Sequence, residues 1–219
     1  MQPKFNRYLM GMDWGLDHPA ANLWIRVDTD QKLIYVSNEF VKSGLSIEEI
    51  AEAVKALSGT EVPEYAVLDP SANKRDPGTK KSITDEYRRC FRVFGGQWEY
   101  FSIKTGDRRD RGYEIVKRYL KKGMIKVHPR CKNLIYGLEN VMVGDKTGDD
   151  ATDALRYACV NIHDAISGMN VLTDSFESMG QLDAEGNKVK VFNFNDPLLF
   201  PEINEKSNDP IMDMIYATV

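Results

Sequence analysis

The chain has 219 residues, 42% of them hydrophobic and 28% charged, which is typical of a globular protein with one domain, or one domain and an appendage. No apolar run approaches the roughly 18–20 residues that a membrane span needs, and residues 1–7 lack the apolar core of a signal peptide. The three cysteines form no CxxC pair and the three histidines are scattered, so we expect reduced thiols and no zinc site.

The net charge of −4 hides an uneven distribution of charged residues. Residues 104–132 hold eleven Lys or Arg and three acids, a net charge of +8, so the rest of the chain carries −12. A second basic run covers residues 73–82. Such runs suit a polyanion, although a solvated helix face would also explain the first one. The side chains that we expect to contact nucleic-acid phosphates are Lys74, Arg75, Lys80, Lys81, Lys104, Arg108, Arg109 and Arg111.

The beginning of the chain predicts three strands and a helix. Residues 8–13 are an apolar run that ends in an acid, and residues 21–28 and 32–41 alternate like half-buried strands. The short polar turns between them predict an antiparallel meander of three strands. Ser46 and Glu49 then form a capping-box pattern at the start of an amphipathic helix that ends near residue 58.

Strands and helices alternate in the remainder of the predicted domain. Residues 65–69 are a short apolar run closed by an Asp-Pro pair, as expected of a central parallel strand. The following segments predict a loop over 70–82, a helix over 83–89, a strand over 91–94, a helix from Asp107 or Asp110 to Gly123, a strand over 124–128, a helix from Pro129, and a helix over 150–165.

This order of elements predicts an RNase H-like α/β fold. Such a fold has a mixed sheet, in which an antiparallel three-strand meander is extended by parallel strands, with helices on both faces. We expect the domain to cover residues 1–166. Residues 167–219 are rich in Asn, Asp and Pro with apolar islands, and predict a C-terminal extension that packs on the domain or on a partner.

Acidic residues lie at three places where this fold would hold them at one edge of the sheet. Asp13 and Asp69 end neighbouring strands, and Asp150 and Asp153 share one face of the last helix. Carboxylates that converge repel one another unless a cation lies between them. Their oxygens suit hard ions, so the sequence predicts a site for Mg²⁺ or Mn²⁺, with two ions able to support phosphodiester hydrolysis.

Each acid also has a purely structural interpretation. Asp13 could cap a turn, Asp69 could start a turn with the proline after it, and Asp149 is the best candidate for the helix N-cap. Asp153 lies too far into the helix to cap it, and Asp lowers helix propensity, so a metal role explains it better. For Arg156 we expect that it holds the helix to the sheet rather than pairing with the acids.

Four segments together resemble the nuclease domain of the large terminase subunit, the DNA-packaging motor of tailed double-stranded DNA bacteriophages. They are GMDWG at 11–15, VLDPSA at 67–72, residues 121–135, and DDATDALRYA at 149–158. The last is the most specific, because the family pattern reads Asp-His-x-x-Asp-Ala-x-Arg-Tyr. The usual histidine is here Asp150, which leaves open whether this residue is a metal ligand.

The resemblance implies a metal-dependent endonuclease that cuts concatemeric viral DNA in the host cytoplasm, with Asp13, Asp69 and Asp153 as catalytic acids. It implies double-stranded DNA, a packaging ATPase domain, a small terminase subunit and a portal as partners, and no membrane. The chain contains no Gly-x-x-x-x-Gly-Lys-Ser/Thr motif, so we expect the isolated nuclease domain. The alternatives are a resolvase or transposase of the same fold, an actin-like ATP-binding domain, and a non-catalytic DNA-binding module.

Overall fold

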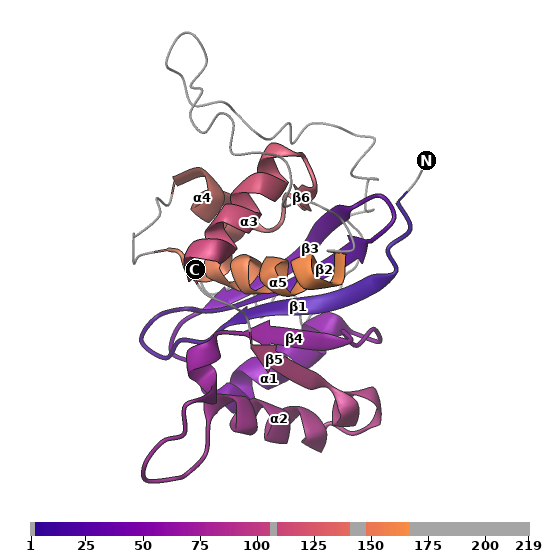
Figure 1. Ribbon diagram of the computed structural model, residues 1–219. Helices are drawn as coiled ribbons and strands as arrows, with labels where there is room; N and C mark the ends of the chain where they lie inside the picture. The colour runs from indigo at the N-terminus through magenta and orange to yellow at the C-terminus, as the bar shows by residue number, and fades with distance from the viewer. Residues whose placement is uncertain (1–2, 106–108, 141–147, 167–219) are drawn as a thin grey trace.

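A computed structural model describes residues 3–105, 109–140 and 148–166 of the chain, and the predicted extension over 167–219 lies outside them. These residues form one six-stranded sheet with helices on both faces (Figure 1). The strands are β1 (Arg7–Asp13), β2 (Ala20–Asp28), β3 (Leu33–Lys42), β4 (Tyr65–Leu68), β5 (Ser102–Thr105) and β6 (Ile125–Val127). The helices are α1 (Ile47–Ser58), α2 (Ile83–Val93), α3 (Arg109–Lys121), α4 (Lys132–Asn140) and α5 (Asp150–Ile166), with 3₁₀ turns at Pro70–Asn73 and Gly96–Tyr100.

The sheet has the mixed topology that the sequence predicts. Its strand order is β5-β4-β1-β2-β3-β6. β1, β2 and β3 form the antiparallel meander, while β4 pairs in parallel with β1, β5 with β4, and β6 with β3. The RNase H-like arrangement is therefore confirmed, and β1 lies near the centre of the sheet, where both of its faces are covered.

One predicted element is wrong and one strand was not predicted in the segment between α1 and α3. Residues 91–94 are not a strand, because α2 continues to Val93. A capping box between Ser82 and Asp85 starts this helix, and Tyr87 and Phe91, spaced i and i+4, are both buried on its inner face. The strand lies later, at Ser102–Thr105, where only one of four side chains is buried and the apolar signal is correspondingly weak.

The helix boundaries otherwise follow the predicted caps. The Ser46–Glu49 capping box is present at the start of α1. The helix expected from Pro129 begins later, at Lys132, and its first backbone N–H groups are bound by a distant side chain: Glu39 of β3 accepts hydrogen bonds from the Asn133 N–H at 2.8 Å and the Leu134 N–H at 2.9 Å. In the part of the chain that the structure describes, no helix is long and apolar enough to cross a membrane.

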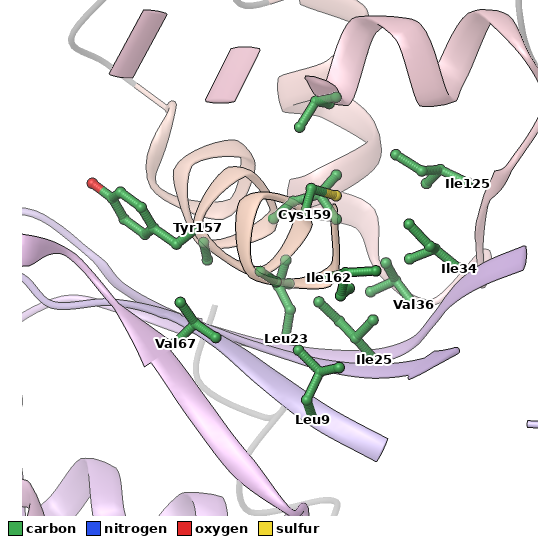
Figure 2. Close-up of a cluster of buried hydrophobic side chains, with 14 of the residues drawn as sticks. Leu9, Leu23, Ile25, Ile34, Val36, Val67, Ile125, Tyr157, Cys159 and Ile162 are labelled. Carbon is green, nitrogen blue, oxygen red and sulfur yellow. The ribbon is translucent and has the colours of Figure 1, made fainter. Parts of the chain in front are cut away.

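Two hydrophobic cores lie on opposite faces of the sheet. One is formed by the sheet with α3, α4 and α5, and the other by the sheet with α1, α2 and the two 3₁₀ turns. Figure 2 shows the first of them, with α5 running over Leu9, Leu23 and Ile25 of the sheet. Leu9 belongs to the α5 side and Met10 to the α2 side, which is the alternation expected of a strand buried on both faces.

Glycines allow α5 to approach its neighbours closely. A Cβ atom on Gly11 of β1 would lie 2.3 Å from the carbonyl oxygen of Ala154. A Cβ on Gly137 of α4 would lie 2.8 Å from the Cγ2 of Thr152, and one on Gly112 of α3 would lie 2.5 Å from the Cγ of Arg156. A larger residue at any of these positions would push α5, or a side chain on it, away from the place it occupies.

We expect the Gly11→Ala substitution to lower the free energy of unfolding by about 3 kcal/mol, because the methyl group would overlap the backbone of α5 rather than a flexible side chain. Urea unfolding followed by circular dichroism measures this change. Gly78→Ala is the control: its added methyl group would meet only the Asp76 carboxylate, at 3.3 Å, and should change stability by less than about 0.5 kcal/mol. Equal stability of the Gly11 variant and the wild type would contradict the packing argument.

Candidate active site

Two of the predicted acids end neighbouring strands at the same level of the sheet. In the parallel pair β1–β4, Gly11 is opposite Val67, and Asp13 and Asp69 each follow two residues later. Val67 belongs to the core under α5, so the alternation of side chains places Asp13 and Asp69 on the α5 side as well. The register of two short strands thus brings together residues that are 56 positions apart in the sequence.

The other two acids come from the first turn of α5. Asp149 precedes the helix, as predicted for its cap, and its carbonyl oxygen accepts hydrogen bonds from the Asp153 N–H and from the Thr152 hydroxyl, both at 2.7 Å. Asp150 and Asp153 follow at positions i and i+3 of the helix. Because Gly11 lets α5 pack directly on β1, this first turn lies against the strand that carries Asp13.

The electrostatics of Asp13 indicate that the other three acids lie near enough to act on its charge. Burial raises the pKa of Asp13 to about 8, and the negative charges of Asp153, Asp150 and Asp69 contribute to the rise in that order, while Arg156 opposes them. None of the described residues donates a hydrogen bond to the Asp13 carboxylate or forms an ion pair with it. Such a carboxylate is costly to ionise unless a cation approaches it.

Asp69 is held in a different way. Its carboxylate accepts one hydrogen bond from the backbone N–H of Ser71 and one from the hydroxyl of Tyr157 on α5. Burial tends to raise the pKa of Asp69, but these hydrogen bonds outweigh it, and the pKa lies below its ordinary value. The predicted Asp-Pro turn is present as well, since Asp69 caps the 3₁₀ turn at Pro70–Asn73. The turn and the site use the same side chain.

Asp153 is bound by a cation from its own helix. Arg156 donates to both of its carboxylate oxygens, at 3.0 Å from Nε and 2.8 Å from a terminal nitrogen, and the Tyr113 hydroxyl of α3 donates to one of them at 2.5 Å. Arg156 is 2% exposed, so this is a buried bidentate ion pair. The expectation that Arg156 only attaches the helix to the sheet is corrected here: it pairs with an acid of the site.

Sequence reasoning did not find the two tyrosines that bind the acids. Tyr157 lies one helical turn after Asp153, so its place on the same face of the last helix could have been read from the sequence, although the acid that it binds is Asp69. Tyr113 carried none, because its place beside Asp153 depends on how α3 packs on α5.

Asp150 lies at the rim of the site, opposite the loop that follows β1. Burial raises the pKa of Asp150, Asp149 and Asp153 raise it further, and His18 lowers it. His18 therefore lies near Asp150, although no sequence pattern distinguished a role at the site from a place in the loop. Trp14, the residue after Asp13, is partly buried against the core under α1 and α2.

The donor chemistry of the site suits a hard divalent ion. As they are placed, no three Asp, Glu, His or Cys side chains of the described ranges stand close enough to enclose an ion, and Arg156 takes both oxygens of Asp153. Carboxylate oxygens nevertheless have two lone pairs each, so those of Asp69 and Asp153 keep acceptor capacity beside their present bonds. The uncompensated Asp13 carboxylate is the observation that fits an ion best.

The predicted DNA contacts fall into two described groups. Lys74, Arg75, Lys80 and Lys81 are exposed on the loop between Asp69 and α2. This loop is ordered by the Asp76 carboxylate, which accepts from the N–H groups of Gly78 and Thr79, and by a bridge between Arg75 and Ser82. Lys104 is exposed on β5, with its ammonium 3.6 Å from the ring centroid of Tyr65. Arg108 and the side chains of Arg109 and Arg111 lie outside the described residues.

A mixed sheet of this topology, with acids at the ends of β1 and β4 and on the helix that crosses them, defines an RNase H-like domain. The chain belongs to the terminase RNaseH-like domain family, which matches residues 10–161. The resemblance seen in the sequence is thereby confirmed, and the resolvase, transposase and actin-like alternatives fall away. No curated protein matches the chain.

Structures of terminases share this fold. The large terminase nuclease domain of phage P22 is 18% identical, with a TM-score of 0.59, over 74% of this chain and 87% of that one. The large terminase of a thermophilic bacteriophage is 16% identical, with a TM-score of 0.57, over 74% of this chain and 41% of that one. The chain thus spans about two fifths of that thermophilic phage protein.

The raised pKa of Asp13 predicts a pH-dependent stability in metal-free buffer. Its folded pKa of about 8 exceeds the ordinary 3.8, so between these values the folded state keeps a proton that the unfolded state has lost. Stability is then lost as the pH rises towards 8. In EDTA at pH 9, Asp13→Asn should be more stable than the wild type by about 2 kcal/mol. The full pKa shift would give a larger difference, at about 1.36 kcal/mol per pKa unit. We expect less because Asp13 keeps some solvent contact, which screens its charge.

Urea unfolding at pH 5 and pH 9 measures this difference. At pH 5 the advantage of the Asp13→Asn variant should shrink, because the wild-type carboxyl is then protonated in the folded state. An advantage of the same size at both pH values would show that the substitution acts through packing and not through charge.

Proposed function

We propose that this terminase domain is a divalent-metal-dependent endonuclease that hydrolyses phosphodiester bonds of double-stranded viral DNA during genome packaging. The proposal is carried by Asp13, a partly buried carboxylate without a counter-charge of its own that lies near three further acids. A domain that only bound DNA would gain nothing from this arrangement, because acids repel phosphate. Membership of the terminase family supports the same conclusion.

The proposed ligands of Mg²⁺ or Mn²⁺ are Asp13, Asp69, Asp150 and Asp153, with Asp13, Asp69 and Asp153 as the catalytic acids. When bound, one or two ions would supply positive charge at the phosphate and lower the pKa of a coordinated water. The protein supplies the geometry: β1 and β4 set the separation of Asp13 and Asp69 through their register, and α5 sets the height of Asp153 above them. Arg156 neutralises Asp153 within the protein.

The proposed DNA path follows the exposed basic residues that lie near Asp69 in the fold. The loop that carries Lys80 begins directly after this acid, and Lys104 lies on β5, the strand next to β4. Phosphate contacts from these two groups would hold the duplex at the site without reading its sequence. We therefore expect cleavage with little sequence preference.

The further partners proposed for the chain are a packaging ATPase domain, a small terminase subunit and a portal, in the cytoplasm of the host cell. The large terminase of the thermophilic bacteriophage, whose chain is more than twice as long as the matching part, also has a structure in complex with ATP-gamma-S. We propose residues 1–166 as the nuclease domain and 167–219 as an extension that packs on it or on one of these partners.

Replacing any catalytic acid should abolish cleavage. With supercoiled plasmid and Mn²⁺ or Mg²⁺, we expect the wild type to nick and linearise DNA, EDTA to stop the reaction, and Asp13→Asn, Asp69→Asn and Asp153→Asn each to lower the rate by more than about 100-fold. Asp30→Asn, at the exposed turn between β2 and β3, is the matched control and should cleave normally.

Calorimetric titration with Mn²⁺ distinguishes the reasons for a negative result. A wild type that binds Mn²⁺ through these acids but does not cleave would be a nuclease that requires its motor partner. A wild type that neither binds Mn²⁺ nor cleaves would be a DNA-binding module, and the proposed function would be wrong.

The basic residues should contribute to DNA affinity mainly through phosphate neutralisation. In the cleavage-deficient Asp153→Asn background, Lys80→Ala and Lys104→Ala should each weaken binding and reduce the slope of log K against log salt concentration by about 1. Lys55→Ala is the control, since Lys55 lies on α1 over the Phe94 ring, on the face of the sheet away from α5 and the acids. Fluorescence anisotropy between about 50 and 200 mM salt gives the slopes. Unchanged slopes in both test variants would place the DNA elsewhere.

A further inference from the structure

Asp69 and Asp153, two of the proposed metal ligands, are connected by a stack of three other side chains: Tyr157, Arg156 and Tyr113. The Arg156 guanidinium lies 4.2 Å from the ring centroid of Tyr157 and 5.0 Å from that of Tyr113. The Tyr157 hydroxyl donates to Asp69, and the Tyr113 hydroxyl donates to Asp153. One guanidinium thus contacts two tyrosine rings, and the hydroxyl of each tyrosine donates a hydrogen bond to one acid.

The stack depends on close packing between α3 and α5. Arg156 passes over Gly112, where a side chain would collide with its Cγ and Cδ at 2.5 and 2.9 Å. Tyr113, the next residue of α3, is thereby brought to the guanidinium and to Asp153. Guanidinium–aromatic contacts and charge-assisted hydrogen bonds both gain strength when they are removed from water, and Arg156 and Tyr157 are only 2% and 3% exposed.

The direction of the Tyr157 side chain sets it apart from a core residue. Figure 2 shows Tyr157 at the margin of the hydrophobic cluster, with its hydroxyl pointing away from the labelled aliphatic side chains. Its ring contributes to the core and to the stack, whereas its oxygen contributes only the bond to Asp69. Phenylalanine would satisfy every packing requirement at this position and would lose that bond alone.

We propose that Tyr157 and Tyr113 are positioning residues, which orient the carboxylates of Asp69 and Asp153 towards the ion site through one shared guanidinium. This inference rests on the proposed nuclease function. Each hydroxyl donates to one carboxylate oxygen and so restricts rotation of the carboxylate before an ion arrives. Without the hydroxyl, the acid must be ordered at the moment of binding, and the metal affinity and the chemical step both suffer.

The test compares Tyr157→Phe, Tyr113→Phe and the control Tyr65→Phe in the full 219-residue chain. Tyr65 is 5% exposed and lies at the opposite end of β4 from Asp69, so the control makes the same chemical change away from the acids and keeps the ring that Lys104 contacts. The measurements are Mn²⁺ affinity by calorimetry, kcat and KM for plasmid cleavage, and the melting temperature.

We expect Tyr157→Phe and Tyr113→Phe each to weaken Mn²⁺ binding about 10-fold, within the range seen for residues that orient metal ligands. The kcat should fall at least as much while KM for DNA stays unchanged, because neither hydroxyl is proposed to contact DNA. The melting temperature in EDTA should change by less than about 2 °C. Tyr65→Phe should behave as the wild type in all three measurements.

The inference would be overturned if both variants bound Mn²⁺ with wild-type affinity, or if their losses followed the melting temperature and were matched by Tyr65→Phe. A wild type that binds no Mn²⁺ would overturn the proposed function itself, and this outcome is seen before any tyrosine variant is compared. If the chain binds Mn²⁺ but requires its motor for cleavage, the Mn²⁺ affinities of the tyrosine variants alone decide whether the two tyrosines are positioning residues.

Discussion

The contact between α5 and β1 is the constraint on which the rest of the structure depends. The helix lies so close to the strand that a methyl group at Gly11 would overlap its backbone. This distance lets α5 fill the core on one face of the sheet and at the same time places its first turn beside the end of the strand. The packing of the core and the position of the acids are therefore set by one separation. Gly112 of α3 and Gly137 of α4 allow the same close approach between α5 and its two neighbouring helices.

Charge repulsion acts against this packing. Four acids lie near the end of β1, and the fold offsets only part of their charge. Arg156 pairs with Asp153, hydrogen bonds stabilise Asp69, and Asp13 has neither. A buried ion pair of this kind contributes little net stability, but it fixes where the acid lies. The arrangement is thus better explained by what the acids do together than by the stability of the domain.

The sequence was informative wherever a short-range pattern determined the structure. Capping boxes, apolar runs and the acid at i+3 from Asp150 predicted α1, the meander and the acidic site, because each depends on neighbours within a few positions. The strand Ser102–Thr105 was missed, since an edge strand with one buried side chain has little apolar signal. The helix past residue 90 was mistaken for a strand, because the aromatic residues that continue α2 are also good strand formers.

The partners of the acids could not be predicted in the same way. Arg156 and Tyr157 were visible in the motif, but which of several neighbours each would bind depends on rotamers and on the packing of α3. Tyr113 and Gly112 have no local pattern that marks them, and their importance is a property of the contact between two helices. The assignment of catalytic and metal-binding roles to the acids remains a prediction.

The place of α5 in the chain has a consequence for how the protein is made. It is the last of the described elements to leave the ribosome, yet its side chains form a large part of the core that covers β1, β2 and β4. Until it is synthesised, that face of the sheet has no central helix, and Asp13 and Asp69 have no third acid. A nascent or truncated chain that stops before Asp150 consequently exposes apolar surface and lacks both acids of α5, so quality control can recognise it before the acidic site is assembled.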